Sequence, residues 1–163
     1  FGHWEMDTVK GQRGVTKSCM LVLTERKTRD EIIIKLKDQT AASVVEALDR
    51  LERKWGDMFS KVFRSITVDN GVEFADYEGM EKSVFGEEKR TFVFYCHPYS
   101  SWERGSNENN NRLIRRHIPK GEDFDGRRSF SFTMISSRVF LSVSTSIHDF
   151  VTPRCPFTVS ISQ

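Results

Sequence analysis

The amino-acid sequence predicts an α/β fold, with one domain in which a mixed five-stranded sheet is flanked by helices. Short runs rich in β-branched and aromatic residues alternate with segments whose apolar residues recur at helical spacing. The chain has 163 residues, of which 37% are hydrophobic, and this suits a single domain with its own core. Over the first 125 residues the order is three strands, a helix, a strand, a helix, a strand and a helix.

The first half of this region contains three strands and a long helix. The strands are short β-prone runs separated by a glycine-containing turn and a polar turn, at residues 4–9, 20–24 and 31–36. An amphipathic helix is expected over residues 41–55, because its apolar residues Val44, Leu48 and Leu51 recur at helical spacing. Thr40 is suited to cap the first turn of this helix, and Gly56 is suited to end it.

The second half adds two strands and two helices. We expect a strand at residues 63–68, a short helix over residues 77–85 that ends near Gly86, and a strand at residues 91–96 that stops before Pro98. The polar run 106–116 is expected to be a helix, with Ser106 or Asn107 as its cap. These elements complete the five strands.

The overall composition excludes several classes of protein. The 25 basic and 23 acidic residues nearly balance, which excludes a highly basic nucleic-acid-binding tail and an acidic disordered chain. Apolar runs stay well below the roughly 18 residues of a membrane span. The three cysteines form no CxxC pair, so neither a disulfide framework nor a structural zinc site is indicated, and a reducing cytoplasm fits best. The chain opens at Phe1 inside a patterned segment, so we expect it to be part of a longer protein.

Three acidic residues occupy unusual places in this order. Asp7 lies in the first strand, Asp69 directly follows the fourth, and Glu108 lies in the first turn of the last helix. Each also has an ordinary interpretation, since Asp7 fits an exposed strand face, Asp69 a turn and Glu108 the positive end of a helix. Taken together, they predict a site for two Mg²⁺ or Mn²⁺ ions, because hard carboxylate oxygens suit these ions and two-metal sites serve phosphodiester chemistry.

The last helix carries positive charge as well as Glu108. Arg115 is seven residues beyond Glu108, so both lie on nearly the same helix face, about 10 Å apart along the axis. Arg112, Arg116 and Lys120 extend the positive side, which predicts contacts to DNA phosphates. A solvated basic helix is the alternative interpretation.

Four ordered motifs carry a resemblance to a known family. They read GHWEMDTV at residues 2–9, TERKTR at 24–29, DNGVEF at 69–74 and PYSSWERGSNEN at 98–109. Together they resemble the integrase-like catalytic core of bacterial insertion-sequence transposases of the IS-thirty family. The resemblance runs from about Gly2 to Phe124 and includes Arg115, Pro119, Lys120 and Gly121.

The resemblance implies an RNase H-like fold and a DDE triad that maps onto Asp7, Asp69 and Glu108. It also implies Mg²⁺-dependent cutting of transposon-end DNA, transfer of a 3′ hydroxyl into target DNA, a homo-oligomer on DNA, and a place in the bacterial cytoplasm at the nucleoid. Trp102 would either pack under the site or stack on DNA. Two other functions stay open: an RNase H-like nuclease that only hydrolyses, and a non-catalytic DNA-binding remnant.

Residues 126–163 differ sharply from the catalytic core expected over residues 1–125. They hold four arginines and one acid, Asp149, lack Lys, Glu, Ala and Asn, and contain nine of the serines. The family resemblance stops at the same point. We interpret this segment as an aberrant tail that follows a change of reading frame, with β-prone runs that have no sheet to join. The catalytic competence of this particular chain is therefore open.

Overall fold

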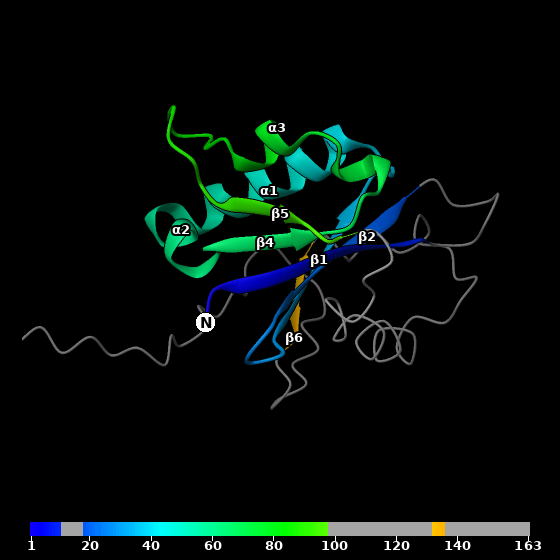
Figure 1. The fold of residues 1–163 in the computed structure, drawn as a ribbon, viewed down its shortest axis with the longest axis horizontal. Helices are drawn as coiled ribbons and strands as arrows, with labels where there is room; N and C mark the ends of the chain where they lie inside the picture. The colour runs from blue at the N-terminus through cyan, green and yellow to red at the C-terminus, as the bar shows by residue number, and fades with distance from the viewer. Residues whose placement is uncertain (11–17, 98–131, 136–163) are drawn as a thin grey trace, which may run out of the picture.

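The computed structural model describes residues 1–10, 18–97 and 132–135. Its centre is a mixed six-stranded sheet with the strand order β5-β4-β1-β2-β3-β6 (Figure 1). The strands are β1 (His3–Lys10), β2 (Cys19–Glu25), β3 (Glu31–Leu36), β4 (Ser65–Val68), β5 (Phe92–Tyr95) and β6 (Phe132–Ile135). Antiparallel pairing joins β1, β2, β3 and β6, whereas β4 is parallel to both β1 and β5. The expected mixed sheet is therefore present, with one strand more than the sequence predicts.

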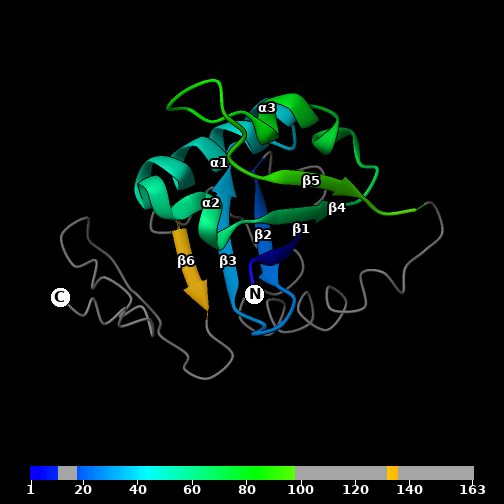
Figure 2. The same ribbon diagram turned by 60° about the vertical axis from the view of Figure 1, so that its left-hand side comes forward.

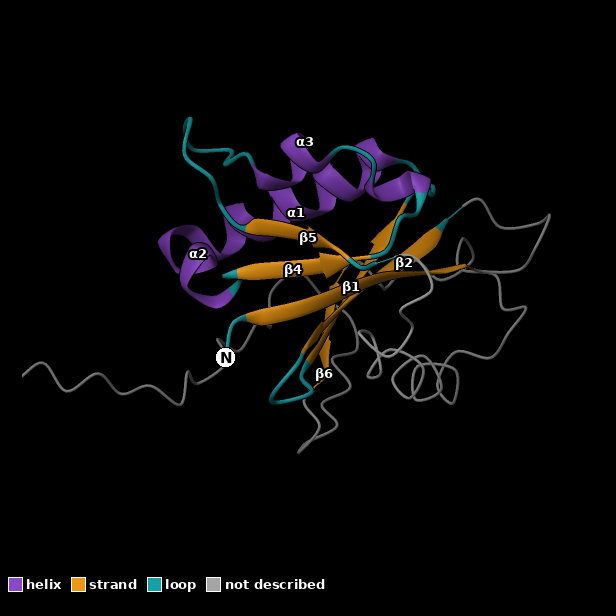
Figure 3. Cartoon of the chain, in the orientation of Figure 1, coloured by secondary structure: helices purple, strands orange, loops and turns teal. Residues whose placement is uncertain are grey.

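The helices of the described chain lie on one side of this sheet (Figures 2 and 3). They are α1 (Ala41–Trp55), α2 (Phe59–Val62) and α3 (Tyr77–Glu81), with two short 3₁₀ turns, η1 (Gly56–Met58) and η2 (Val72–Phe74). None of the helices in the described residues is long and apolar enough to cross a membrane. One layer of helices thus covers one face of the described sheet.

Helix α1 forms as the sequence predicts. The Thr40 side chain accepts a hydrogen bond from the Ser43 backbone N–H at 3.3 Å, which satisfies one of the unpaired donors of the first turn. Gly56 ends the helix at a φ of 53°, a conformation that favours glycine. Between these ends, the buried face of α1 carries Val44, Ala47, Leu48 and Leu51, which join the main core. Burial of this stripe holds α1 against the sheet.

Successive side chains along each strand point to opposite faces of the sheet, and each face carries its own apolar cluster. Trp4 and Met6 belong to the main core beneath α1, whereas Val9 packs with β2 and β3 residues in a second cluster on the other face. The indole N–H of Trp4 donates to the Val62 carbonyl at 2.9 Å, and its ring lies 4.8 Å from that of Phe63. Because successive strand residues point to opposite faces, the odd-numbered positions of β1 face away from α1.

Two boundaries differ from the sequence prediction by more than one residue. The fourth strand begins at Ser65, because Phe59–Val62 form helix α2 and the Phe63 ring stacks on Phe59 at 4.6 Å. Helix α3 ends at Glu81 instead of continuing to residue 85, and Lys82 turns to an extended conformation. Short helices such as these give little periodic signal of their own. The helix expected at residues 106–116 lies outside the described residues.

A buried arginine links the segment between α3 and β5 to helix α1 through ion pairs with two carboxylates. The Arg90 guanidinium is fully buried and contacts Asp49 at 2.5 Å and Glu52 at 3.2 Å, both on α1. It also donates to the carbonyls of Gly79 and Met80 at 2.9 and 2.8 Å. These bonds give the cation two carboxylate partners and two carbonyl acceptors, which offsets the cost of burying it.

The sixth strand comes from the segment interpreted as a tail. Phe132–Ile135 pairs antiparallel with β3, in a register that places Phe132 opposite Ile34 and Ile135 opposite Glu31. The β-prone runs that are expected to have no sheet to join, at residues 139–144 and 157–162, lie outside the described residues. The edge of β3 supplies the backbone hydrogen-bonding partners of Phe132–Ile135. The change of reading frame itself stays a prediction.

Candidate active site

Asp7 lies in β1, and Asp69 directly follows the neighbouring strand β4. Strand β1 pairs with β4 in parallel, with Trp4 opposite Ile66 and Glu5 opposite Thr67. Continued by two residues, this register sets Asp69 beside Asp7, and neighbouring strands lie about 4.8 Å apart. Asp69 directly follows β4, as the sequence predicts, and both aspartates are half-buried.

Both aspartates belong to the sheet face that is turned away from α1. Their predecessors Met6 and Val68 are fully buried in the main core beneath α1, so alternation directs Asp7 and Asp69 to the opposite face. One oxygen of each carboxylate is oriented by a backbone N–H. Thr8 donates to Asp7 Oδ1 and Gly71 donates to Asp69 Oδ1, each at 2.9 Å. A backbone N–H therefore restrains each of the two carboxylates.

The loop after Asp69 is anchored to β5. Asn70 donates through Nδ2 to the Cys96 carbonyl at 3.2 Å, and the Cys96 N–H donates to the Val68 carbonyl at 2.9 Å. Gly71 has a φ of −63°, so this turn does not use the positive φ that glycine permits. A Cβ at Gly71 would instead lie 2.7 Å from Glu73 Oε2 and 2.9 Å from Asp69 Oδ1. The close approach of two carboxylates explains why a glycine suits this position.

Sequence reasoning missed a buried carboxylate next to this loop. Glu73 is only 8% exposed, and its Oε1 accepts a hydrogen bond from the Thr8 hydroxyl at 2.7 Å and another from Gln39 Nε2. Gln39 Nε2 also donates to the Thr8 hydroxyl oxygen at 3.1 Å. Burial raises the pKa of Glu73, but the hydrogen bonds outweigh burial and hold the pKa below its usual value. The only sequence signal is the place of Glu73 within the DNGVEF motif.

More polar and acidic side chains lie on the face of Asp7. Strand pairing sets Glu5, Thr24 and Glu31 in one row across β1, β2 and β3. Glu5 forms an ion pair with Arg26 at 2.9 Å. The Glu31 carboxyl is buried, its Oε2 has no hydrogen-bond partner among the described residues, and burial raises its pKa to about 7. Several carboxyl groups therefore share the face that carries the candidate site.

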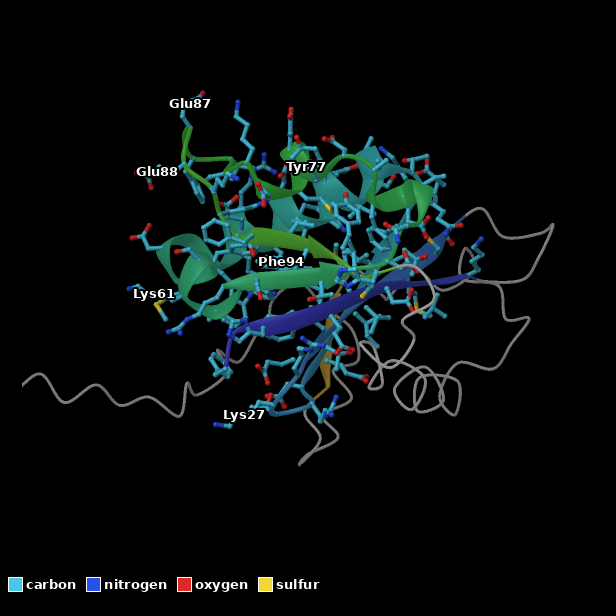
Figure 4. The ribbon with its side chains drawn as sticks, viewed as in Figure 1. Lys27, Lys61, Tyr77, Glu87, Glu88 and Phe94 are labelled. Carbon is cyan, nitrogen blue, oxygen red and sulfur yellow. The ribbon has the colours of Figure 1, made fainter. Side chains whose placement is uncertain are left out.

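Two exposed aromatic side chains occupy the same face on the edge strand β5. Val93 packs against the main core, so alternation turns Phe92 and Phe94 to the other side, where they are 57% and 56% exposed. Figure 4 labels Phe94 on this strand. The face therefore combines carboxylates near its centre with apolar rings at its β5 edge.

The remaining predicted site residues lie outside the described residues. They are Glu108, Trp102, Arg112, Arg115, Arg116 and Lys120. Within the part of the chain that is described, no group of three His, Cys, Asp or Glu side chains could hold a metal ion. The donor chemistry of Asp7 and Asp69 nevertheless fits Mg²⁺ or Mn²⁺, which prefer carboxylate oxygens and keep part of their water shell. The described residues therefore include two of the three predicted metal ligands, Asp7 and Asp69.

The sequence of the chain is similar to those of several known transposases. No protein-family model matches it. It is 40% identical over 124 residues to the transposase for insertion sequence element IS4351 of Bacteroides fragilis, a match that covers 76% of this chain and 35% of that protein. It is 39% identical over 119 residues to transposase InsI for insertion sequence element IS30A of Escherichia coli K12, covering 73% and 28%. The chain therefore spans about a third of the length of the curated relatives it matches.

A solved structure confirms the fold. A chain of the simian T-cell lymphotropic virus intasome, determined with PP2A regulatory subunit B56 gamma, superposes with a TM-score of 0.54 at 17% sequence identity. The superposition covers 70% of this chain and 38% of that one. The expected RNase H-like architecture, a mixed sheet flanked by helices, is thus confirmed. About three quarters of the chain is homologous to the transposases of bacterial insertion sequences, those of IS30 among them.

Proposed function

We propose that the chain is the catalytic domain of a DNA transposase, which cleaves transposon-end DNA and transfers the resulting 3′ hydroxyl into target DNA. The observation that supports the proposal is the parallel pairing of β1 with β4, whose register, continued by two residues, would set Asp69 beside Asp7. The homology to insertion-sequence transposases supports it independently. Glu108, from the PYSSWERGSNEN motif, is proposed as the third acid.

Asp7, Asp69 and Glu108 would hold two Mg²⁺ or Mn²⁺ ions. When bound, such a pair activates an attacking oxygen and stabilises the leaving oxygen in phosphodiester chemistry. The protein contributes the orientation of its ligands, since Asp7 belongs to a paired strand and the Asp69 turn is tied to β5.

The DNA contacts are proposed for the segment that follows β5. Arg112, Arg115, Arg116 and Lys120 would contact phosphates, which position DNA without reading its sequence. Trp102 would pack under the site or stack on a base. The chain would act in the bacterial cytoplasm, at the nucleoid, as a homo-oligomer assembled on DNA.

The test is a strand-transfer assay with the full chain. The substrate is a labelled duplex from the border of the element that encodes the chain, mixed with a supercoiled plasmid and Mg²⁺ or Mn²⁺. Joined product of label and plasmid supports the proposal. Metal-dependent nicking without joining would support a hydrolytic nuclease instead, and retention of DNA without cleavage would support a non-catalytic remnant. Either of these two results overturns the transposase proposal for this chain.

A further inference from the structure

One polar cluster connects three segments that are far apart in the sequence. Thr8 belongs to β1, Gln39 to the loop before α1, and Glu73 to η2 beyond the Asp69 turn. The Thr8 hydroxyl donates to Glu73 Oε1 at 2.7 Å across 65 residues of sequence, and Gln39 Nε2 bonds both partners. We call these three side chains the Glu73 cluster. Glu73 is buried and its two partners are half-buried, so the hydrogen bonds of the cluster are partly shielded from bulk water.

The Glu73 cluster reaches both proposed metal ligands. On one side, Thr8 follows Asp7 directly, and its backbone N–H donates to Asp7 Oδ1 at 2.9 Å. On the other side, Glu73 Oε2 and Asp69 Oδ1 approach the same point, 2.7 and 2.9 Å from where a Gly71 Cβ would lie. Thr8 faces the main core, whereas Asp7 faces away from it, so the cluster supports the aspartates from the opposite side of the sheet.

We propose that Glu73 is a positioning residue for the proposed metal site. Glu73 accepts a hydrogen bond from the Thr8 hydroxyl, and its Oε2 occupies the position next to Gly71 where a Cβ would lie. These two contacts hold the Asp7 segment of β1 in place relative to the Asp69 turn. The inference rests on the proposed function, because it assumes that Asp7 and Asp69 bind metal. Glu73 acts through Thr8 and Gly71 and is not itself assigned as a ligand.

Loss of the Thr8–Glu73 hydrogen bond should weaken metal binding, because metal ligands must be positioned precisely. Ligand sets work within about 0.5 Å of their productive geometry, and loss of a supporting hydrogen bond typically costs about 10- to 100-fold in metal affinity. Thr8→Val removes the hydroxyl at nearly constant volume. Thr8→Ser keeps the hydroxyl, and Glu73→Gln keeps an oxygen that can accept it. These substitutions separate the hydrogen bond from the size of the side chain.

The experiment measures Mn²⁺ binding to the full chain without DNA, by isothermal titration and by the metal-dependent rise in melting temperature. We expect Thr8→Val and Glu73→Ala to raise the half-saturating Mn²⁺ concentration about 10-fold or more. Thr8→Ser and Glu73→Gln should stay near the unmodified chain. Thr24→Val is the matched control, because it makes the same change on β2 at a hydroxyl that has no hydrogen-bond partner within residues 1–10, 18–97 and 132–135.

A purely structural role gives a different result. If Thr8→Val lowers the melting temperature without metal but leaves half-saturation unchanged, the inference is overturned. Thr8→Val alone distinguishes a positioning role from a purely structural role, even if Glu73→Ala does not fold. If the unmodified chain binds no Mn²⁺, the metal site and the inference both fail. Normal Mn²⁺ binding with the expected variant effects, but without DNA joining, would contradict the proposed function alone.

Discussion

Replacing one aspartate of the candidate site should stabilise the metal-free protein. Asp7 lies on β1 and Asp69 directly follows the neighbouring strand β4, so we expect their carboxylates to repel one another when no cation is between them. At a separation of about 5 Å, the spacing of neighbouring strands, two unit charges interact by about 1 kcal/mol in bulk water and about 3 kcal/mol at an effective dielectric constant of 20. Both side chains are half-buried, which places the expected gain from Asp7→Asn or Asp69→Asn between these limits.

The assay is thermal unfolding in EDTA and again over a series of Mg²⁺ concentrations. For a chain of this size, each kcal/mol shifts the melting temperature by about 2–4 °C, so either variant should melt about 2–12 °C above the unmodified chain in EDTA. Saturating Mg²⁺ should reverse the order, since a ligand stabilises the protein that binds it. Asparagine keeps the oxygen that accepts each backbone N–H, so these hydrogen bonds are retained.

Asp76→Asn is the matched control. Asp76 caps helix α3, and its Oδ1 accepts the Gly79 N–H at 2.9 Å, the same length as the bond from Gly71 to Asp69. Asparagine caps helices about as well as aspartate, so this variant should neither gain stability in EDTA nor lose the response to Mg²⁺. The reasoning is refuted if Asp7→Asn and Asp69→Asn melt below the unmodified chain in EDTA, or if they respond to Mg²⁺ as it does.

Three further outcomes follow from the described residues. Arg90→Met should lower the free energy of unfolding by about 3–5 kcal/mol in urea, because it leaves the buried carboxylate of Glu52 without its cation; an unchanged urea midpoint would contradict this. Glu31 has a pKa raised to about 7, so the folded chain keeps a proton that the unfolded chain releases. Its contribution to stability should therefore fall from about pH 4.5 to 7, and Glu31→Gln should abolish that fall in urea titrations across this range. Gly71→Ala should reduce metal-dependent DNA cleavage more than it reduces melting temperature, because a Cβ would displace the carboxylates on either side; normal cleavage would show that the turn tolerates it.

The sequence predicts an element well when the residues of that element carry both its hydrophobic pattern and its end signals. The run at residues 31–36 is bounded by polar residues and matches β3, and helix α1 carries both of its end signals, Thr40 and Gly56. No comparable signal marks α2, which has four residues, or β6, whose strand pairing depends on the edge of β3. Such elements are decided by tertiary contacts that periodicity does not record.

The candidate site was predictable only in part for a similar reason. Asp7 and Asp69 were found because an acid in an apolar strand and an acid at a strand end are locally unusual, and the family resemblance then related them. Glu73 was missed because its partners Thr8 and Gln39 are 65 and 34 residues away. An acid in a turn ordinarily indicates a solvated side chain, and only the folded structure shows that this one is buried.

Asp7, Asp69 and Glu108 are proposed to act together on DNA. The most direct measurement compares Mg²⁺-dependent cleavage of border DNA by the unmodified chain with cleavage by Asp7→Asn, Asp69→Asn, Glu108→Gln and the control Asp76→Asn. We expect cleavage by the unmodified chain and the control, and none by the three triad variants, all of which should remain folded by circular dichroism. Cleavage at the unmodified rate by any one of the three would remove that residue from the site and contradict a joint role of the three acids.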